Sequence, residues 1–134
     1  MNIDNEAIIE ALINTSTATH YGLPVVEVDG CEYAIARDDD EVLTACRENI
    51  EDMLWACSTS FLLRHMSIPA AFEPALKAIQ HDQCESCNDM IRECIADMDA
   101  LVQEAYDTDG AGHFLSAYDG NEDEYLGAIW FRIS

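Results

Sequence analysis

The first periodic pattern in the chain is helical. Between residues 4 and 13, apolar residues recur every three to four positions, which is the spacing of one face of an α-helix. These residues are Ile8, Ile9, Leu12 and Ile13. We therefore expect a short amphipathic helix at the N-terminus, followed by a polar connection over residues 15–20.

Two β-prone runs come next, at residues 25–28 and 31–36, and Asp29-Gly30 separates them. A two-residue Asp-Gly loop strongly favours a β-hairpin, because both central residues of its tight turn need a positive φ. Aromatic and β-branched residues return at residues 125–133. This last segment is typical of a strand, which could join the hairpin as a third strand.

Two longer helical patterns occupy the middle of the chain. The first starts at Asp38, whose spacing to Glu41 is typical of a helix N-cap, and its apolar residues continue to Met66. The second starts at Pro74, which suits the first turn of a helix, and it runs for about 30 residues to Asp107. A short connection between two long helices predicts that they pack as an antiparallel pair.

These elements predict an α+β fold in a single domain over residues 1–134. Two long antiparallel helices and a short N-terminal helix would pack with a small antiparallel sheet, made of the β-hairpin and the C-terminal strand. No apolar stretch approaches the roughly 18–20 residues that a membrane span needs, and the first residues lack the pattern of a signal peptide. We expect a cytoplasmic protein whose six cysteines are reduced.

The charge narrows the choice of partners. The chain has 27 Asp and Glu residues against 6 Lys and Arg residues, which gives a formal net charge of −21. Such a surface repels nucleic acids and anionic membranes, so we expect direct binding to neither, and basic proteins become the favoured partners. Hydrophobic residues make up 49% of the chain, which is too many for a disordered acidic tail.

The acidic residues also gather on one side of the predicted helices. At 100° per residue, seven carboxylates of the second long helix share one face along about 37 Å, and a shorter row lies on the first. Successive carboxylates stand about 6 Å apart along the axis, comparable to the phosphates of one DNA strand. This spacing predicts a surface that imitates nucleic acid. Its predicted partner-binding residues are Asp82, Glu85, Asp89, Glu93, Asp97, Glu104, Glu48, Glu51 and Asp52.

A plainer interpretation of the same acidity stays open. Most charge runs are solvated faces, and an acidic composition poor in lysine also arises as adaptation to high salt. The chain would then be a structural or assembly protein whose acidity only keeps it in solution. A homodimer formed through the long helices is a further open alternative.

Metal binding and catalysis find little support in the sequence. His81, Cys84, Cys87 and Cys94 resemble a zinc-binding set, but a helix would turn Cys87 and Cys94 into its apolar seam, which favours buried thiols. Asp107-x-Asp109 imitates the start of an EF-hand loop, although the twelfth position is not the glutamate that calcium requires. No nucleophile elbow, P-loop or dinucleotide fingerprint is present. We therefore expect no metal, no cofactor and no enzyme activity.

Three segments carry a resemblance to a known group of proteins. They are residues 29–40, residues 54–62, and residues 112–120 together with 131–134. In this combination the chain resembles a group of small acidic proteins encoded by tailed bacteriophages. The resemblance covers about residues 25–134. Cys57 departs from the pattern of the group, because an aromatic residue is commoner at this position. The group has no established activity.

The resemblance implies a protein that works in the cytoplasm of a bacterial host. Small acidic phage proteins often neutralise host proteins by occupying nucleic-acid-binding surfaces, including those of restriction and CRISPR effectors. The hypothesis from the sequence is therefore a phage inhibitor of the anti-CRISPR or anti-restriction type, which binds a host nucleic-acid-binding protein by mimicry.

Overall fold

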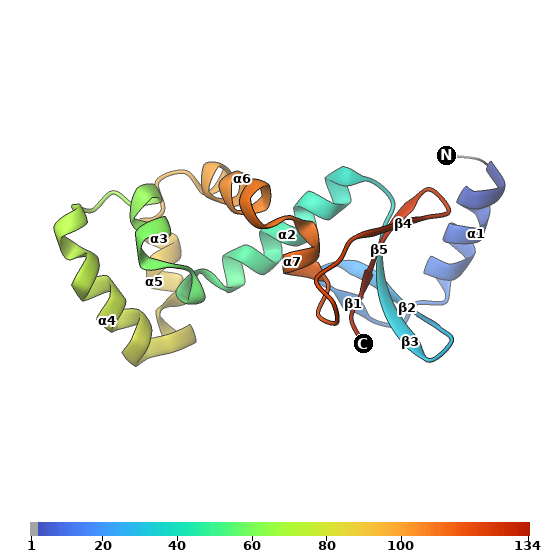
Figure 1. Cartoon of the computed structure of the whole chain (residues 1–134), viewed down its shortest axis with the longest axis horizontal. Helices are drawn as coiled ribbons and strands as arrows, with labels where there is room; N and C mark the ends of the chain where they lie inside the picture. The colour runs from blue at the N-terminus through green and yellow to red at the C-terminus, as the bar shows by residue number, and fades with distance from the viewer. Residues whose placement is uncertain (1–2) are drawn as a thin grey trace. The chain divides into compact units, whose positions relative to one another are not determined.

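The computed structural model describes residues 3–134, which form two compact units (Figure 1). The first unit combines the chain up to Asn49 with Tyr106–Ser134, and the second is Ile50–Ala105. The chain passes from one unit to the other within helix α2 and again within helix α6. The prediction of a single domain for residues 1–134 stays a prediction.

The first unit is built on a five-stranded antiparallel sheet, which confirms the α+β class. Its strand order is β1-β2-β3-β5-β4. The predicted hairpin is β2 and β3, and the C-terminal strand β5 pairs with β3, as expected for a third strand. The strands span β1 Thr19–His20, β2 Leu23–Val28, β3 Cys31–Ala36, β4 Asp123–Tyr125 and β5 Ala128–Arg132.

Three hairpins in this sheet share one kind of turn, a residue of positive φ followed by glycine. Asp29 and Gly30 have φ values of 53° and 80°, which confirms the predicted Asp-Gly turn. The pairs Tyr21-Gly22 and Leu126-Gly127 adopt the same conformation between β1 and β2 and between β4 and β5. The prediction of one unbroken strand over residues 125–133 was therefore wrong, because a turn divides it.

Helix α1, Ile3–Asn14, packs on one face of the sheet and confirms the predicted N-terminal helix. Its Ile9 is buried in one cluster with residues of β2, β3 and β5. On the opposite face Ala34 and Phe131 are also fully buried, and α7, Ala111–Leu115, lies on that side with the start of α2 (Figure 1). Both faces of the sheet are therefore covered. The Ile9 cluster contains Ile9, Val26, Ile35, Ala128 and Trp130.

Helix α2, Asp39–Asp52, begins where the sequence predicted. The Glu41 N–H donates a hydrogen bond to Asp38 Oδ1 at 2.9 Å, which is the N-cap interaction. The Glu41 carboxylate accepts in turn from the Arg37 N–H at 2.8 Å, one residue earlier than in a standard capping box. Local sequence therefore fixes the start of this helix.

The second unit is helical, and its helices are short. Ser58 caps α3 by accepting a hydrogen bond from the Phe61 N–H, and Pro74 stands in the first turn of α4, as predicted. In chain order the elements are η1 Leu54–Ala56, α3 Thr59–His65, η2 Ala70–Phe72, α4 Glu73–Gln83, η3 Cys84–Cys87, α5 Asn88–Cys94 and α6 Met98–Asp109. No helix among residues 3–134 is long and apolar enough to cross a membrane.

The prediction of two long helices is wrong. The first ends at Asp52, and a 3₁₀ turn separates α2 from α3. The second is interrupted at Cys84, whose φ of 49° is not helical, and again after Cys94. There the Ile95 backbone pairs with Met66 as an isolated antiparallel bridge. The predicted packing of two long antiparallel helices is therefore wrong, and a homodimer stays an open alternative.

The breaks are stabilised by side chains that hydrogen-bond the backbone of η1. Gln80 Nε2 donates to the carbonyls of Trp55 and Cys57 at 3.0 and 2.8 Å. Asn88 is buried, accepts from the Trp55 N–H at 3.1 Å and donates to the Glu51 carbonyl at 2.7 Å. Helical periodicity continues across these breaks, and for this reason the apolar pattern alone did not reveal them.

Candidate protein-binding surfaces

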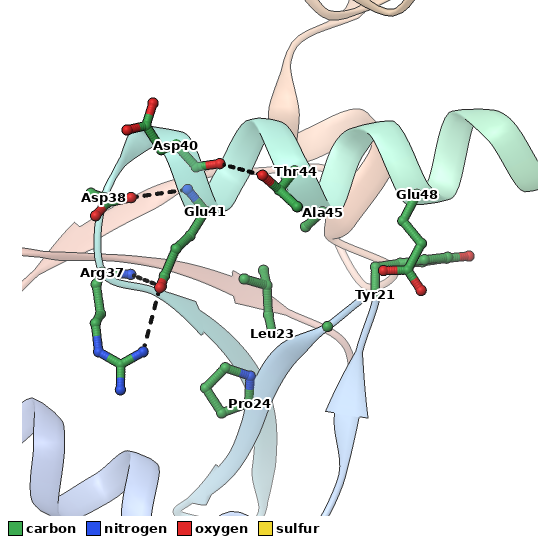
Figure 2. A pocket seen from close by; sticks show the side chains of 11 residues that line it. Tyr21, Leu23, Pro24, Arg37, Asp38, Asp40, Glu41, Thr44, Ala45 and Glu48 are labelled. Atoms are coloured by element: carbon green, nitrogen blue, oxygen red, sulfur yellow. Dashed lines mark hydrogen bonds and ion pairs between the residues drawn. The ribbon is translucent and has the colours of Figure 1, made fainter.

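A pocket of about 330 Å³ lies in the first unit, between the β1–β2 turn and helix α2 (Figure 2). We call it the Tyr21 pocket. Apolar side chains and carboxylates both line it, so it can surround a long side chain with a charged end. Its lining residues are Tyr21, Gly22, Leu23, Pro24, Arg37, Asp38, Asp40, Glu41, Thr44, Ala45 and Glu48.

One end of the Tyr21 pocket is closed by an ion-pair network. Arg37 Nε donates to Glu10 Oε1 at 2.6 Å, and its Nη1 lies 3.4 Å from Glu41 Oε2. Hydrogen bonding to Arg37 lowers the pKa of the Glu10 carboxyl. The single guanidinium of the pocket is therefore already bound by two carboxylates of the protein itself.

The other end of the pocket contains an unpaired carboxylate. Figure 2 shows Glu48 reaching from α2 towards the β1–β2 turn, where Gly22 is so close that an added Cβ would lie 3.5 Å from Glu48 Oε2. The structure gives Glu48 no hydrogen bond or ion pair within the described chain. The sequence predicted Glu48 as a partner-binding residue, but on a helix face shared with Glu51 and Asp52.

The ring of Tyr21 is held in place by its neighbour. The His20 and Tyr21 rings meet edge to face with their centroids 4.8 Å apart. His20 Nε2 is bonded in turn to the Leu115 carbonyl at 2.9 Å. Tyr21 was not among the residues predicted from the sequence, although the Tyr-Gly pair before a β-prone run is a usable hairpin signal.

The second unit carries the central part of the predicted acidic face. Glu85, Asp89 and Glu93 are spaced by four residues along the continuous helical run of η3 and α5, and all three are exposed. We call these three residues the acidic row. The Asp89 side chain is 95% exposed. The row spans about 14 Å, because the 3₁₀ turn η3 rises about 2.0 Å per residue and α5 about 1.5 Å, and it is much shorter than the face predicted from one long helix.

One arginine accompanies the acidic row. Arg92 lies 3.9 Å from Asp89 and 3.7 Å from Asp52. Its Nη2 also donates to the Glu51 carbonyl at 3.0 Å, which draws the guanidinium towards the end of α2. Arg92 therefore offsets part of the negative charge. Glu85 and Glu93 extend the row on both sides and form no ion pair with a basic residue among residues 3–134.

The remaining predicted residues are placed apart from the row. Asp82 is exposed on α4, before the break at Cys84, and Asp97 caps α6 by accepting from the Ala100 N–H at 3.2 Å. Glu51 is only half-exposed, whereas Asp52 is exposed beside Arg92. The prediction that these carboxylates share one helix face is therefore wrong, because they lie on several short elements.

Glu104 is engaged inside the second unit. Its carboxylate accepts from Arg64 Nη2 at 2.8 Å and is also hydrogen-bonded to His65 Nε2. The hydrogen bonds from His65 and then Arg64 lower the pKa of the Glu104 carboxyl. These contacts join α6 to α3, so we assign Glu104 a structural role and leave it out of the binding surface.

Glu104→Gln should therefore reduce stability at neutral pH and have less effect in acid. A carboxyl whose pKa is lowered by folding stabilises the fold above its ordinary pKa of 4.5, and this stabilisation is lost as the pH falls through the lower value. We expect the urea midpoints of the wild type and the variant to differ at neutral pH and to converge well below pH 4.5. Glu93→Gln is the matched control, and an equal difference at both pH values would contradict the assignment.

Most of the acidic residues lie in the first unit, whereas most of the predicted partner-binding residues lie in the second. The first unit holds 17 of the 27 Asp and Glu residues, which leaves 10 in the second, and each unit has three of the six Lys and Arg residues. The acidic row and the Tyr21 pocket thus belong to two units that are both negative. Both units therefore favour positively charged ligands over negatively charged ones.

The predicted thiols and histidines do not form a metal site in the described chain. Cys84 is exposed and Cys87 is buried, where its thiol donates to the Cys84 carbonyl and burial raises its pKa. Among residues 3–134, no group of three or more His, Cys, Asp or Glu side chains could hold a metal ion. Cys46 is a buried thiol whose pKa burial raises to about 12.

A second pocket, of about 410 Å³, lies within the second unit. Trp55, Lys77 and His81 line it together with the hydroxyls at the start of α3. Gln80 also lines it, and its side chain is occupied by Thr59 and the η1 carbonyls. We therefore assign Gln80 a structural role in stabilising η1.

Comparison of the chain with protein-family models, with curated proteins and with solved structures finds no match.

Proposed function

We propose that the protein is a non-enzymatic acidic inhibitor of bacteriophage type, which acts in the host cytoplasm. It would occupy the nucleic-acid-binding surface of a basic host protein, such as a restriction or CRISPR effector. The observation that carries the proposal is the acidic row, in which Glu85, Asp89 and Glu93 repeat every four residues on the exposed side of η3 and α5.

The spacing of the row supports mimicry of a phosphate backbone. Its carboxylates are about 6–8 Å apart along the helix axis and stand where lysine and arginine side chains of a partner could reach them in succession. Like charges at this spacing destabilise a helix by roughly 0.2–0.5 kcal/mol per pair. A row that costs stability and lacks interleaved lysines is better explained by recognition than by solubility alone.

Charge over the whole chain supports fast capture of such a partner. With a net charge of −21, the protein attracts basic surfaces over about a Debye length, and this attraction weakens with salt. The same field repels nucleic acids and anionic membranes. The proposed inhibitor therefore competes with nucleic acid for the partner and does not bind nucleic acid itself.

Reversal of the acidic row should weaken capture of the partner at least about tenfold, which corresponds to 1.4 kcal/mol. The experiment is a pull-down from bacterial lysate at moderate salt, with the tagged wild type and with a Glu85→Lys, Asp89→Lys, Glu93→Lys variant. Captured proteins are identified by mass, and the affinity of each is then measured with purified components. A short DNA or RNA duplex should displace the wild-type protein from its partner.

The control is a variant with the same change in charge in the other unit, Glu6→Lys, Glu27→Lys, Glu124→Lys. These three carboxylates are exposed, and the structure gives them no ion pair. Equal loss of affinity in both variants would show that only net charge matters and would contradict the acidic row. A protein that captures no basic partner and unfolds unless salt is molar would support the salt-adapted alternative.

A further inference from the structure

The Tyr21 pocket combines three features that suit a cationic side chain. The Tyr21 ring, which contacts His20, forms one wall, and Leu23, Pro24 and Ala45 supply apolar surface. At one end stands the Glu48 carboxylate, which has no hydrogen bond or ion pair among residues 3–134. Cations bind over aromatic faces, and a guanidinium or ammonium also pairs with a carboxylate. The long aliphatic stem of such a side chain can lie against the apolar wall.

The charge of the lining excludes an anion as the natural occupant. Four of the lining residues are acidic and one, Arg37, is basic. The Arg37 guanidinium is already bound by Glu10 and Glu41, so it has little capacity left for an incoming carboxylate or phosphate. An incoming cation would instead find Glu48 without a partner and Asp40 exposed at the rim.

We propose that the Tyr21 pocket receives one arginine side chain of a basic protein partner, an inference that rests on the proposed function and names a second contact for it. Arginine is favoured over lysine because its planar guanidinium stacks on an aromatic ring and is less strongly hydrated than an ammonium. A volume of about 330 Å³ is at the lower end of ligand pockets and suits a single side chain. The first unit thus anchors the partner with one residue, and the acidic row supplies the charge.

The test uses the full-length ¹⁵N-labelled protein and two synthetic peptides of equal length and charge, one of alternating glycine and arginine and one of alternating glycine and lysine. Titration is followed by amide chemical shifts. The arginine peptide should shift the amide signals of residues 21–23 and 44–48 first and bind several-fold more tightly than the lysine peptide. Shifts confined to other acidic surfaces would overturn the proposal, and equal affinities would overturn the choice of arginine.

Two different variants test the pocket, so that the result does not depend on a single substitution. Glu48→Gln and Tyr21→Asn should each weaken the arginine peptide at least about fivefold, and Asn suits the second variant because it tolerates the positive φ of Tyr21. Glu27→Gln, on the exposed end of β2, removes the same charge outside the pocket and should change affinity less than about twofold. An equal effect of Glu27→Gln and Glu48→Gln would overturn the pocket.

The two proposals can fail separately. If capture of a basic protein depends on Glu85, Asp89 and Glu93 but not on Glu48 or Tyr21, the pocket is wrong and the proposed function survives. If the arginine peptide binds in the pocket but no basic protein is captured from lysate, the pocket is supported and the proposed function is wrong.

Discussion

Gly112→Ala should lower the free energy of unfolding of the first unit by about 2–3 kcal/mol, although alanine is normally the better helix former. Gly112 is buried in α7, and a Cβ at this position would lie 2.3 Å from the Gly120 carbonyl oxygen and 2.9 Å from the backbone of Asn121. Backbone atoms cannot rotate away as a flexible side chain can. The added methyl group must therefore displace the loop after α7.

That loop is fixed by several contacts. Ser116 is buried, and its hydroxyl contacts Asp119 Oδ1 at 2.8 Å and the Arg132 carbonyl at 2.9 Å. The Arg132 guanidinium lies over the Tyr118 ring at 3.7 Å. Displacing the loop would disturb this network, so the predicted cost exceeds the gain of up to about 1 kcal/mol from helix propensity.

The measurement is urea unfolding followed by Trp130 fluorescence in a Trp55→Phe background, so that the signal reports the first unit. Gly30→Ala is the control, because the space around Gly30 is open and only its φ of 80° opposes a side chain, at a cost of about 1–2 kcal/mol. A Gly112→Ala variant as stable as the wild type would mean that the loop moves freely.

Asn88→Ala should destabilise the second unit by about 2–3 kcal/mol. The Trp55 N–H donates to the Asn88 side chain, and no other side chain among residues 3–134 accepts from it. The variant therefore leaves this N–H without its partner. The Glu51 carbonyl loses a bond of 2.7 Å but keeps the one from Arg92. The unsatisfied Trp55 N–H therefore accounts for most of the expected cost.

Hydrogen exchange gives the most direct measurement of this effect. The Trp55 amide should lose its protection in Asn88→Ala, and the urea midpoint of the second unit should fall. Gln83→Ala removes an exposed amide from α4 and should change stability by less than about 0.5 kcal/mol. Unchanged protection of the Trp55 amide in Asn88→Ala would show that Asn88 does not hold η1.

The Asn88 prediction also bears on the acidic row. Asn88 stands directly before Asp89 at the start of α5, and Arg92 contacts the same Glu51 carbonyl. The buried side of this short helix is thus tied to the end of α2, while its other side presents carboxylates. A destabilised η1 should weaken partner capture together with the fold, which separates this variant from charge reversal.

Local sequence determined the elements whose signals are short in range. The Asp-Gly turn, the Asp38 N-cap, Pro74 in the first turn of α4 and the N-terminal helix depend on interactions between residues a few positions apart. Such interactions are readable from the chain alone. The sequence also determined the net negative charge of the chain.

Only the tertiary structure decided where the helices break and which carboxylates are available. The apolar period continues across Cys84, but Gln80 and Asn88 bond to backbone groups of residues 51–57, and these long-range bonds favour several short helices. The sequence predicts that Glu104 is an exposed, partner-binding acid. In the structure it pairs with Arg64 and His65, which are about 40 positions earlier. Glu48 faces a pocket formed with a turn far from it in sequence. Periodicity records which side of an element is apolar, whereas the choice of partners depends on contacts that only the folded chain brings together.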